Sequence, residues 1–90
     1  MLRSRQKMYY VYILLNESWT RTYTGVAVDV DKRLKEDNNG EAISSRPYRP
    51  YEVIHIEAYD SLKEARAKEQ FYKTTTGRRK LKELVTKYKR

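Results

Sequence analysis

The stretch that decides the fold is residues 9–25, YYVYILLNESWTRTYTG. Residues 9–15 are rich in β-branched and aromatic side chains, which favour a strand. Residues 16–20 are polar and predict a loop, and residues 21–26 predict a second short strand. Because a loop of this length joins neighbouring antiparallel strands, the segment predicts a hairpin.

Helix and strand signals continue after the hairpin. Asp29 can cap a helix that runs to about Asp37, and the Asn-Asn-Gly of residues 38–40 ends it. Residues 41–50 contain two prolines and two serines and predict an irregular loop. Residues 51–58 alternate and predict a third strand. Its expected faces are Glu52, Ile54, Ile56 and Ala58 on one side and Tyr51, Val53, His55 and Glu57 on the other.

Two more helices are predicted near the C-terminus. A capping-box pattern at residues 61–64 opens a helix that ends near Tyr72 or Lys73. Residues 74–77, Thr-Thr-Thr-Gly, are expected to break it before a basic helix over about residues 78–88. The predicted order is β-β-α-β-α-α. This order describes an α+β fold with a small three-stranded antiparallel sheet flanked by helices.

Length and composition limit the possible functions. The chain has 90 residues, which suits one small domain over residues 9–88 with a basic tail at residues 1–8. It has no cysteine, so a disulfide framework, a thiolate zinc site and a thiol nucleophile are excluded. No apolar run approaches the ~20 residues that cross a bilayer. No signal peptide is recognisable, so we expect a cytoplasmic protein.

The positive charge is unevenly distributed. The net charge is +8, and residues 61–90 alone hold eleven basic and three acidic side chains. A basic third beside a body of slightly negative charge is typical of a polyanion-binding protein, although a solvated helix face would look the same. A membrane partner is not expected, since this segment has few bulky apolar residues. The candidate nucleic-acid-binding residues are Arg78, Arg79, Lys80 and Lys82, followed by Lys87, Lys89 and Arg90.

One acidic side chain stands out on the helix predicted to begin at residue 61. Leu62, Ala65, Glu69 and Tyr72 fall on one stripe at helical spacing, which places Glu69 among core-facing residues. A carboxylate there has to be paired, hydrogen-bonded or bound to a metal, because burying an isolated charge is prohibitive. The alternative is a position at the helix edge, from which Glu69 reaches solvent.

Two tyrosines and an arginine are further candidates. Tyr12 and Tyr23 lie on the two arms of the hairpin, opposite or diagonal to each other according to the register. They either form a packed cross-strand pair or point their hydroxyls at one reacting centre. Arg33 and Asp37 are four residues apart on the first helix, so they either form a surface ion pair or hold a guanidinium beside a groove that suits a phosphate.

The order of these residues resembles the GIY-YIG nuclease domain. Tyr10-Val11-Tyr12 and Tyr23-Thr24-Gly25 are similar to its two named motifs, and Arg33 and Glu69 follow at matching places. The resemblance extends over about residues 9–85. It is strongest to small stand-alone proteins of the superfamily, a largely uncharacterised group related to the N-terminal domain of UvrC.

This resemblance implies a metal-dependent endonuclease that hydrolyses phosphodiester bonds of DNA rather than RNA, in DNA repair or processing. It implies that Glu69 holds the divalent metal, Mg²⁺ or Mn²⁺, and that Arg33 contacts the scissile phosphate. Tyr12 is the preferred general base, with Tyr23 orienting water or phosphate. Tyr12 needs the charge of the metal and of Arg33 to lower its pKa from about 10. Gly25 would allow a close backbone approach, and a targeting protein partner would supply specificity.

Asp37 departs from the family pattern, because many relatives carry His or Tyr there. An aspartate either adds negative charge near the phosphate and ties up Arg33, or instead adds a metal ligand. The first alternative to an active enzyme is therefore a nucleic-acid-binding module with weak or absent catalysis. The second is a protein-interaction domain whose charge serves only solubility.

Overall fold

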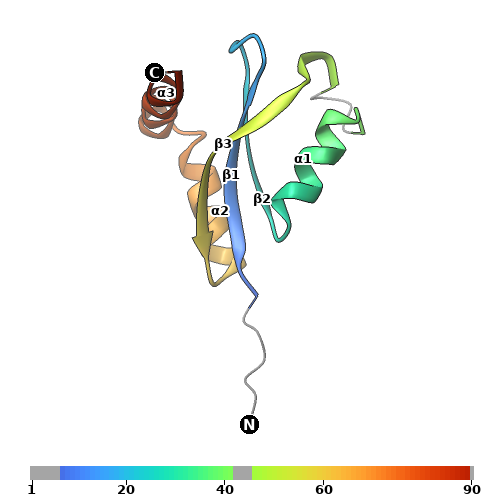
Figure 1. Cartoon of the computed structure of the whole chain (residues 1–90). Helices are drawn as coiled ribbons and strands as arrows, with labels where there is room; N and C mark the ends of the chain where they lie inside the picture. The colour runs from blue at the N-terminus through green and yellow to red at the C-terminus, as the bar shows by residue number, and fades with distance from the viewer. Residues whose placement is uncertain (1–6, 42–45, 90) are drawn as a thin grey trace.

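The elements of the chain follow the predicted order (Figure 1). A computed structural model describes residues 7–41 and 46–89, so most of the predicted basic tail lies outside the described residues. The elements are β1 (Tyr9–Asn16), β2 (Thr22–Ala27), α1 (Val30–Asn38), the 3-10 turn η1 (Arg46–Tyr48), β3 (Tyr51–Tyr59), α2 (Leu62–Phe71) and α3 (Thr75–Lys89). The predicted α+β fold is confirmed.

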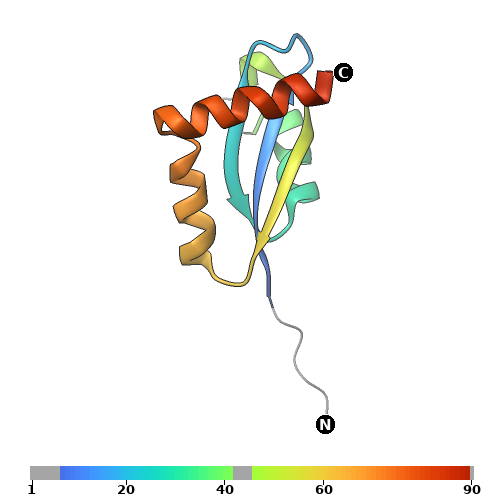
Figure 2. The same cartoon turned by 90° about the vertical axis from the view of Figure 1, so that its left-hand side faces the viewer.

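The sheet has the antiparallel order β2-β1-β3, which makes the first strand of the hairpin the central one. Helix α1 covers one face, and α2 and α3 cover the other (Figures 1 and 2). Central β1 is therefore covered on both faces, and Val11, Ile13, Leu14 and Leu15 have exposed fractions of 1% or less. A strand in this position is uniformly apolar, as the Tyr-Ile-Leu-Leu run of β1 is.

Alternation along β1 divides the core into two clusters. Val11 and Ile13 pack with Ala65 on the side of α2 and α3. Tyr12 and Leu14 point the other way and pack with residues of α1 and the start of β3. Because successive strand side chains point to opposite faces, Tyr12 is placed on the α1 side of the sheet.

A β-bulge in β3 makes the predicted faces of that strand wrong. Ile13 lies opposite His55 while Leu14 lies opposite Val53, so Ile54 is the extra residue. Ile54 packs with the α2–α3 core, whereas Tyr51 and Val53 pack with the α1 core. One inserted residue reverses the alternation from there on, and strict period-two counting therefore fails.

The Thr-Thr-Thr-Gly segment begins a helix instead of separating two, so the predicted start near residue 78 is wrong. Thr74 acts as the N-cap of α3, since its Oγ1 accepts a hydrogen bond from the Gly77 amide at 3.1 Å. Gly77 is buried, and a Cβ there would overlap the carbonyl oxygen of Phe71. Glycine is needed for the close crossing of α2 and α3, not for a break.

Helix α3 crosses the sheet near the hairpin end (Figure 2). Leu81 and Leu84 pack against the α2–α3 side of the core, while the basic residues of the helix are exposed. In the part of the chain that the structure describes, no helix has the length and apolar character needed to cross a bilayer.

Candidate functional site

The site is organised by the side chain of Tyr12, which crosses β2 at Gly25. The two residues are partners in the β1–β2 register. A Cβ placed on Gly25 would lie 2.5 Å from the Tyr12 hydroxyl oxygen and 2.7 Å from Cζ. The glycine therefore makes room for a tyrosine ring, and the expected close approach is that of a side chain, not of backbone.

The Tyr12 hydroxyl lies where three elements meet. It is hydrogen-bonded to Arg33 of α1 and interacts electrostatically with Asp37 of the same helix. It also interacts electrostatically with Glu69 of α2, which runs beside β2 (Figure 2). Of the other predicted catalytic residues, Arg33 is thus bonded to the Tyr12 phenol and Glu69 acts on it electrostatically.

The electrostatics of this phenol oppose its ionisation. Burial raises the pKa of Tyr12 above its ordinary value of 10.0, and the charges of Asp37 and Glu69 raise it further. The hydrogen bond and charge of Arg33 act in the opposite direction but do not compensate. Arg33 thus lowers the pKa of Tyr12, as expected. The protein groups around Tyr12 together nevertheless leave its hydroxyl protonated at neutral pH.

Arg33 is held by a well-capped helix. The Asp29 side chain accepts a hydrogen bond from the Lys32 amide at 3.1 Å, as predicted for the start of α1. The Arg33 side chain is 47% exposed and lies 3.7 Å from Glu36. Tyr12, Asp37 and Glu36 all raise the pKa of Arg33, so its charge is permanent. A half-exposed guanidinium anchored at its inner side remains able to bind a phosphate.

Asp37 is buried, with an exposed fraction of 5%. Its carboxylate acts electrostatically on both Tyr12 and Arg33. The spacing of Arg33 and Asp37 also suggested a surface ion pair. Because Asp37 is buried, the two residues do not form a solvent-exposed pair. Asp37 adds negative charge at the inner end of the site.

Tyr23 lies on the same face of the sheet as Tyr12 but diagonal to it, because its partner in β1 is Leu14. Its ring packs edge-on against Tyr51, with the centroids 5.6 Å apart. Burial raises the pKa of Tyr51 to about 12. Of the two register alternatives, the diagonal one is therefore observed, and the packed pair is Tyr23 with Tyr51.

Sequence reasoning missed the residue that holds Tyr51. The Asn38 side chain accepts a hydrogen bond from the Tyr51 amide at 2.7 Å and donates one to the Tyr51 carbonyl at 3.0 Å. This pair of bonds fixes α1 to the start of β3 and supports the ring under Tyr23. The sequence indicated Asn38 only as part of the signal that ends the first helix. No local pattern distinguishes an asparagine that ends a helix from one that also binds a distant backbone segment.

Glu69 projects from the flank of α2. Its side chain is 15% exposed, and the Lys73 ammonium lies 3.8 Å from its Oε2. Ala65 and Tyr72 of the predicted stripe are buried, but Leu62 is 40% exposed, so that part of the stripe was wrong. Leu62 is the first residue of α2, one turn before the helix reaches the core at Ala65.

The donor set near Glu69 fits a cation that keeps most of its water ligands. Within residues 7–41 and 46–89, no group of three or more acidic or histidine side chains gathers to hold a metal. Mg²⁺ commonly uses one or two carboxylates and retains several waters, so a single carboxylate is compatible with it. Lys73 already occupies a cation position beside Glu69.

Six of the seven predicted nucleic-acid-binding residues lie on α3 and are exposed, whereas Arg90 lies outside the described residues. Arg78, Arg79 and Lys82 line a groove between α3 and the hairpin end, and the lining does not include Lys80. The same groove contains Trp19 and Arg21, which composition did not single out.

The chain is similar in sequence to curated proteins of two bacteria. UPF0213 protein YazA of Bacillus subtilis is 32% identical over 90 residues, covering 99% of this chain and 86% of the relative. UPF0213 protein SSP2268 of Staphylococcus saprophyticus is 33% identical over 75 residues, covering 82% and 90% of the two chains.

A solved structure is similar as well. The solution NMR structure of the UPF0213 protein BH0048 from Bacillus halodurans has a TM-score of 0.51 and 31% identity. The match covers 86% of this chain and 84% of that one. The family model described as the GIY-YIG catalytic domain matches residues 8–82. The chain therefore belongs to the GIY-YIG catalytic domain family.

Proposed function

We propose that this chain is a divalent-metal-dependent endonuclease that hydrolyses phosphodiester bonds in DNA, with Tyr12, Tyr23, Arg33 and Glu69 as its catalytic residues. The observation that carries the proposal is the position of the Tyr12 hydroxyl. It bonds to Arg33 and lies within electrostatic range of Glu69, over a glycine whose Cβ would displace it. Membership of the GIY-YIG family supports a nuclease-like activity.

Arg33 is assigned to the scissile phosphate. Its exposed guanidinium can pair with two phosphate oxygens and stabilise the negative charge that develops on them during attack by water. The hydrogen bond with Tyr12 orients the guanidinium before substrate binds. A preoriented cation of this kind requires little reorganisation during the reaction.

Glu69 is assigned to Mg²⁺ or Mn²⁺. When bound there, the cation supplies Lewis-acid stabilisation of the charge on the phosphate oxygens. Because Lys73 competes for the same carboxylate, Lys73→Gln should tighten Mn²⁺ binding measured by calorimetry. Replacing Glu69 with Gln should remove that binding.

The tyrosines divide the remaining work. Tyr12 bonds to Arg33 and lies over Gly25, and we assign it to taking a proton from the attacking water or to holding that water. Because burial and two carboxylates keep its pKa raised, we expect its ionisation to depend on added positive charge at the site. Tyr23, fixed against Tyr51, is assigned to orienting water or phosphate.

The test is cleavage of branched, nicked and single-stranded DNA with Mg²⁺ or Mn²⁺. We expect Glu69→Gln and Arg33→Ala to abolish product, while Glu83→Gln, an exposed glutamate on α3, should leave it unchanged. Cleavage that survives both site substitutions would remove the assignment. Circular dichroism of each variant separates loss of activity from loss of fold.

A nucleic-acid-binding module with weak catalysis is the second candidate, and the burial of Asp37 favours it. This carboxylate adds negative charge beside Tyr12 and Arg33. If it suppresses turnover, Asp37→His should raise the cleavage rate, and Asp37→Asn should raise it less. Salt-dependent DNA binding without products in either variant would favour the binding module instead.

A further inference from the structure

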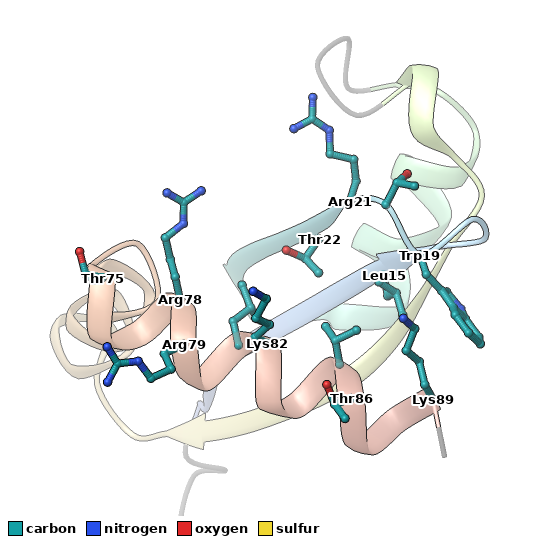
Figure 3. A pocket seen from close by; sticks show the side chains of 13 residues that line it. Leu15, Trp19, Arg21, Thr22, Thr75, Arg78, Arg79, Lys82, Thr86 and Lys89 are labelled. Atoms are coloured by element: carbon teal, nitrogen blue, oxygen red, sulfur yellow. The ribbon is translucent and has the colours of Figure 1, made fainter.

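A groove runs between α3 and the loop that joins β1 to β2 (Figure 3). Its volume is about 730 Å³, and it is open to solvent. Its floor and walls come from the end of β1, the hairpin loop, the first residues of β2 and most of α3. None of the predicted catalytic residues lines it, so it is a separate surface.

The lining of this groove carries one sign of charge. Five of its side chains are cationic and none is acidic. The five are Arg21, Arg78, Arg79, Lys82 and Lys89. Arg21 is already engaged with Tyr48, to whose hydroxyl it donates a hydrogen bond at 2.8 Å. A phosphate backbone laid along the other four, all on α3, would release counterions, which favours binding in a salt-dependent manner.

Trp19 adds an aromatic platform at one end of the groove (Figure 3). Its indole is 48% exposed, and the Lys89 ammonium lies 4.8 Å from the ring centroid. The residue has a positive φ of 60°, which is uncommon for a bulky side chain. The cation–π contact with Lys89 joins this exposed ring to the end of α3.

The loop that carries Trp19 is nevertheless held in place. The Asn16 side-chain oxygen accepts hydrogen bonds from the amides of Thr20 at 2.9 Å and Arg21 at 2.8 Å. The Asn16 amide group donates to the hydroxyls of Ser18 and Thr20. Trp19 thus projects from an ordered turn, and an ordered ring loses little freedom when a base stacks on it.

The groove and the candidate site share the strand β2. Thr22 lines the groove, and Tyr23 follows it in the chain. Gly25 lies three residues after Thr22, which is about 10 Å at the usual rise of a strand. On the helical side, Thr75 of the groove follows closely after Lys73, the partner of Glu69. The groove and Tyr23 lie on opposite faces of the sheet, so a nucleic-acid strand would pass from the groove to the site around the edge strand β2.

We infer that this groove binds a single-stranded segment of nucleic acid, with phosphates along α3 and one unpaired base stacked on Trp19. The inference rests on the proposed function in taking nucleic acid as the substrate. A single strand is favoured over a duplex because duplex bases already stack on each other, whereas an unpaired base offers its face to an aromatic side chain. The cations bind phosphate without selecting sequence.

The chain contains a single tryptophan, so its fluorescence reports directly on this groove. The metal-free Glu69→Gln protein is titrated with a short oligothymidylate and with a blunt duplex of equal length. We expect the single strand to quench Trp19 emission and to bind more tightly than the duplex. If the four cations of α3 engage phosphates, the slope of log K against log salt approaches about −2.8 for a single strand.

Matched variants separate stacking from charge. Fluorescence anisotropy of labelled oligothymidylate should show binding weakened roughly ten-fold in Trp19→Ala and largely retained in Trp19→Phe. Lys82→Ala should reduce the magnitude of the salt slope by about 0.7, because one phosphate contact is lost. Lys80→Ala, the same change on the same helix outside the groove, should leave the slope unchanged.

Three results would overturn the inference: no quenching by the single strand, equal loss of binding in Lys80→Ala and Lys82→Ala, or quenching by an acidic peptide and not by the oligonucleotide. The last result would identify an acidic protein segment as the occupant. Single-strand binding that persists without cleavage under any metal would reject the proposed hydrolysis and leave the groove assignment standing. Cleavage that does not depend on Trp19 or Lys82 would reject the groove assignment and leave the proposed hydrolysis standing.

Discussion

Replacing Gly25 with alanine tests how the site is built, because this residue is where two strands and the central phenol come together. In the wild-type protein a new Cβ would lie 2.5 Å from Oη, 2.7 Å from Cζ and 3.1 Å from Cε1 of Tyr12. The Tyr12 side chain is 4% exposed and cannot move aside freely. Either the ring or the β2 backbone has to shift.

The expected cost follows from this overlap. Overpacking a well-filled core usually destabilises by about 1–3 kcal/mol. Replacing glycine with alanine without strain instead stabilises by about 0.4–1 kcal/mol, since the unfolded chain loses freedom. Gly25→Ala should therefore lower the free energy of unfolding by about 2 kcal/mol, and it should also displace the Tyr12 hydroxyl from Arg33.

A double-mutant cycle isolates the cause. Tyr12→Leu removes the three atoms that the new methyl group would meet, so Gly25→Ala in that background should be neutral or slightly stabilising. Urea unfolding of the four proteins should give a coupling of about 2 kcal/mol. An equal effect of Gly25→Ala in both backgrounds would refute the claim that this glycine exists to accommodate Tyr12.

Further predictions concern pH and helix capping. Burial tends to raise the pKa of Glu57, but hydrogen bonds from neighbouring hydroxyls and an imidazole lower it below 4.5. The ionised carboxylate therefore contributes to the free energy of unfolding above that pH, and the contribution is lost as the pH falls through the lowered pKa. Glu57→Gln should accordingly destabilise most near neutral pH and least in acid, as measured by urea unfolding. The pKa values of Tyr51 and Tyr59 are raised to about 12, chiefly by burial for the first and by a hydrogen bond to Glu57 for the second, so stability should decline as pH rises from about 10 toward 12. Tyr51→Phe should remove part of that alkaline loss, and an unchanged alkaline profile would contradict the burial of a neutral phenol. Thr74→Ala removes the cap that accepts the Gly77 amide and should cost about 1 kcal/mol of unfolding free energy, with Thr76→Ala as the control.

Local patterns were sufficient for most of the elements. The Tyr-Val-Tyr-Ile run, the cap at Asp29 and the cap at Ser61 are confirmed as the start of β1, α1 and α2. These features depend on neighbours a few residues away, which sequence displays directly. The order of elements and the family followed from the same information.

Long-range packing decided what counting residues could not. The bulge at Ile54 depends on how β3 fits β1, and the helical start at Thr75 depends on how closely α3 approaches Phe71. Strands β1 and β3 are far apart in sequence, so the period-two rule failed there. Phe71 is only six residues before Gly77, but their contact forms only when α2 and α3 cross, which the glycine rule does not take into account. Asn38 escaped notice for the same reason, since its partner Tyr51 lies beyond a loop.

The sequence by itself determined that this is a small basic α+β domain, because composition and short-range periodicity are properties of the chain. It also determined the order of two tyrosines, an arginine and a glutamate that resembles the family motifs. Only the tertiary structure decided that Tyr12 passes over Gly25 to bond with Arg33 within electrostatic range of Glu69, and that Trp19 joins the cations of α3 in one groove. The physical reason is that burial, electrostatic coupling and groove shape arise between segments far apart in sequence, and they exist only once β1, α1, α2 and α3 have packed.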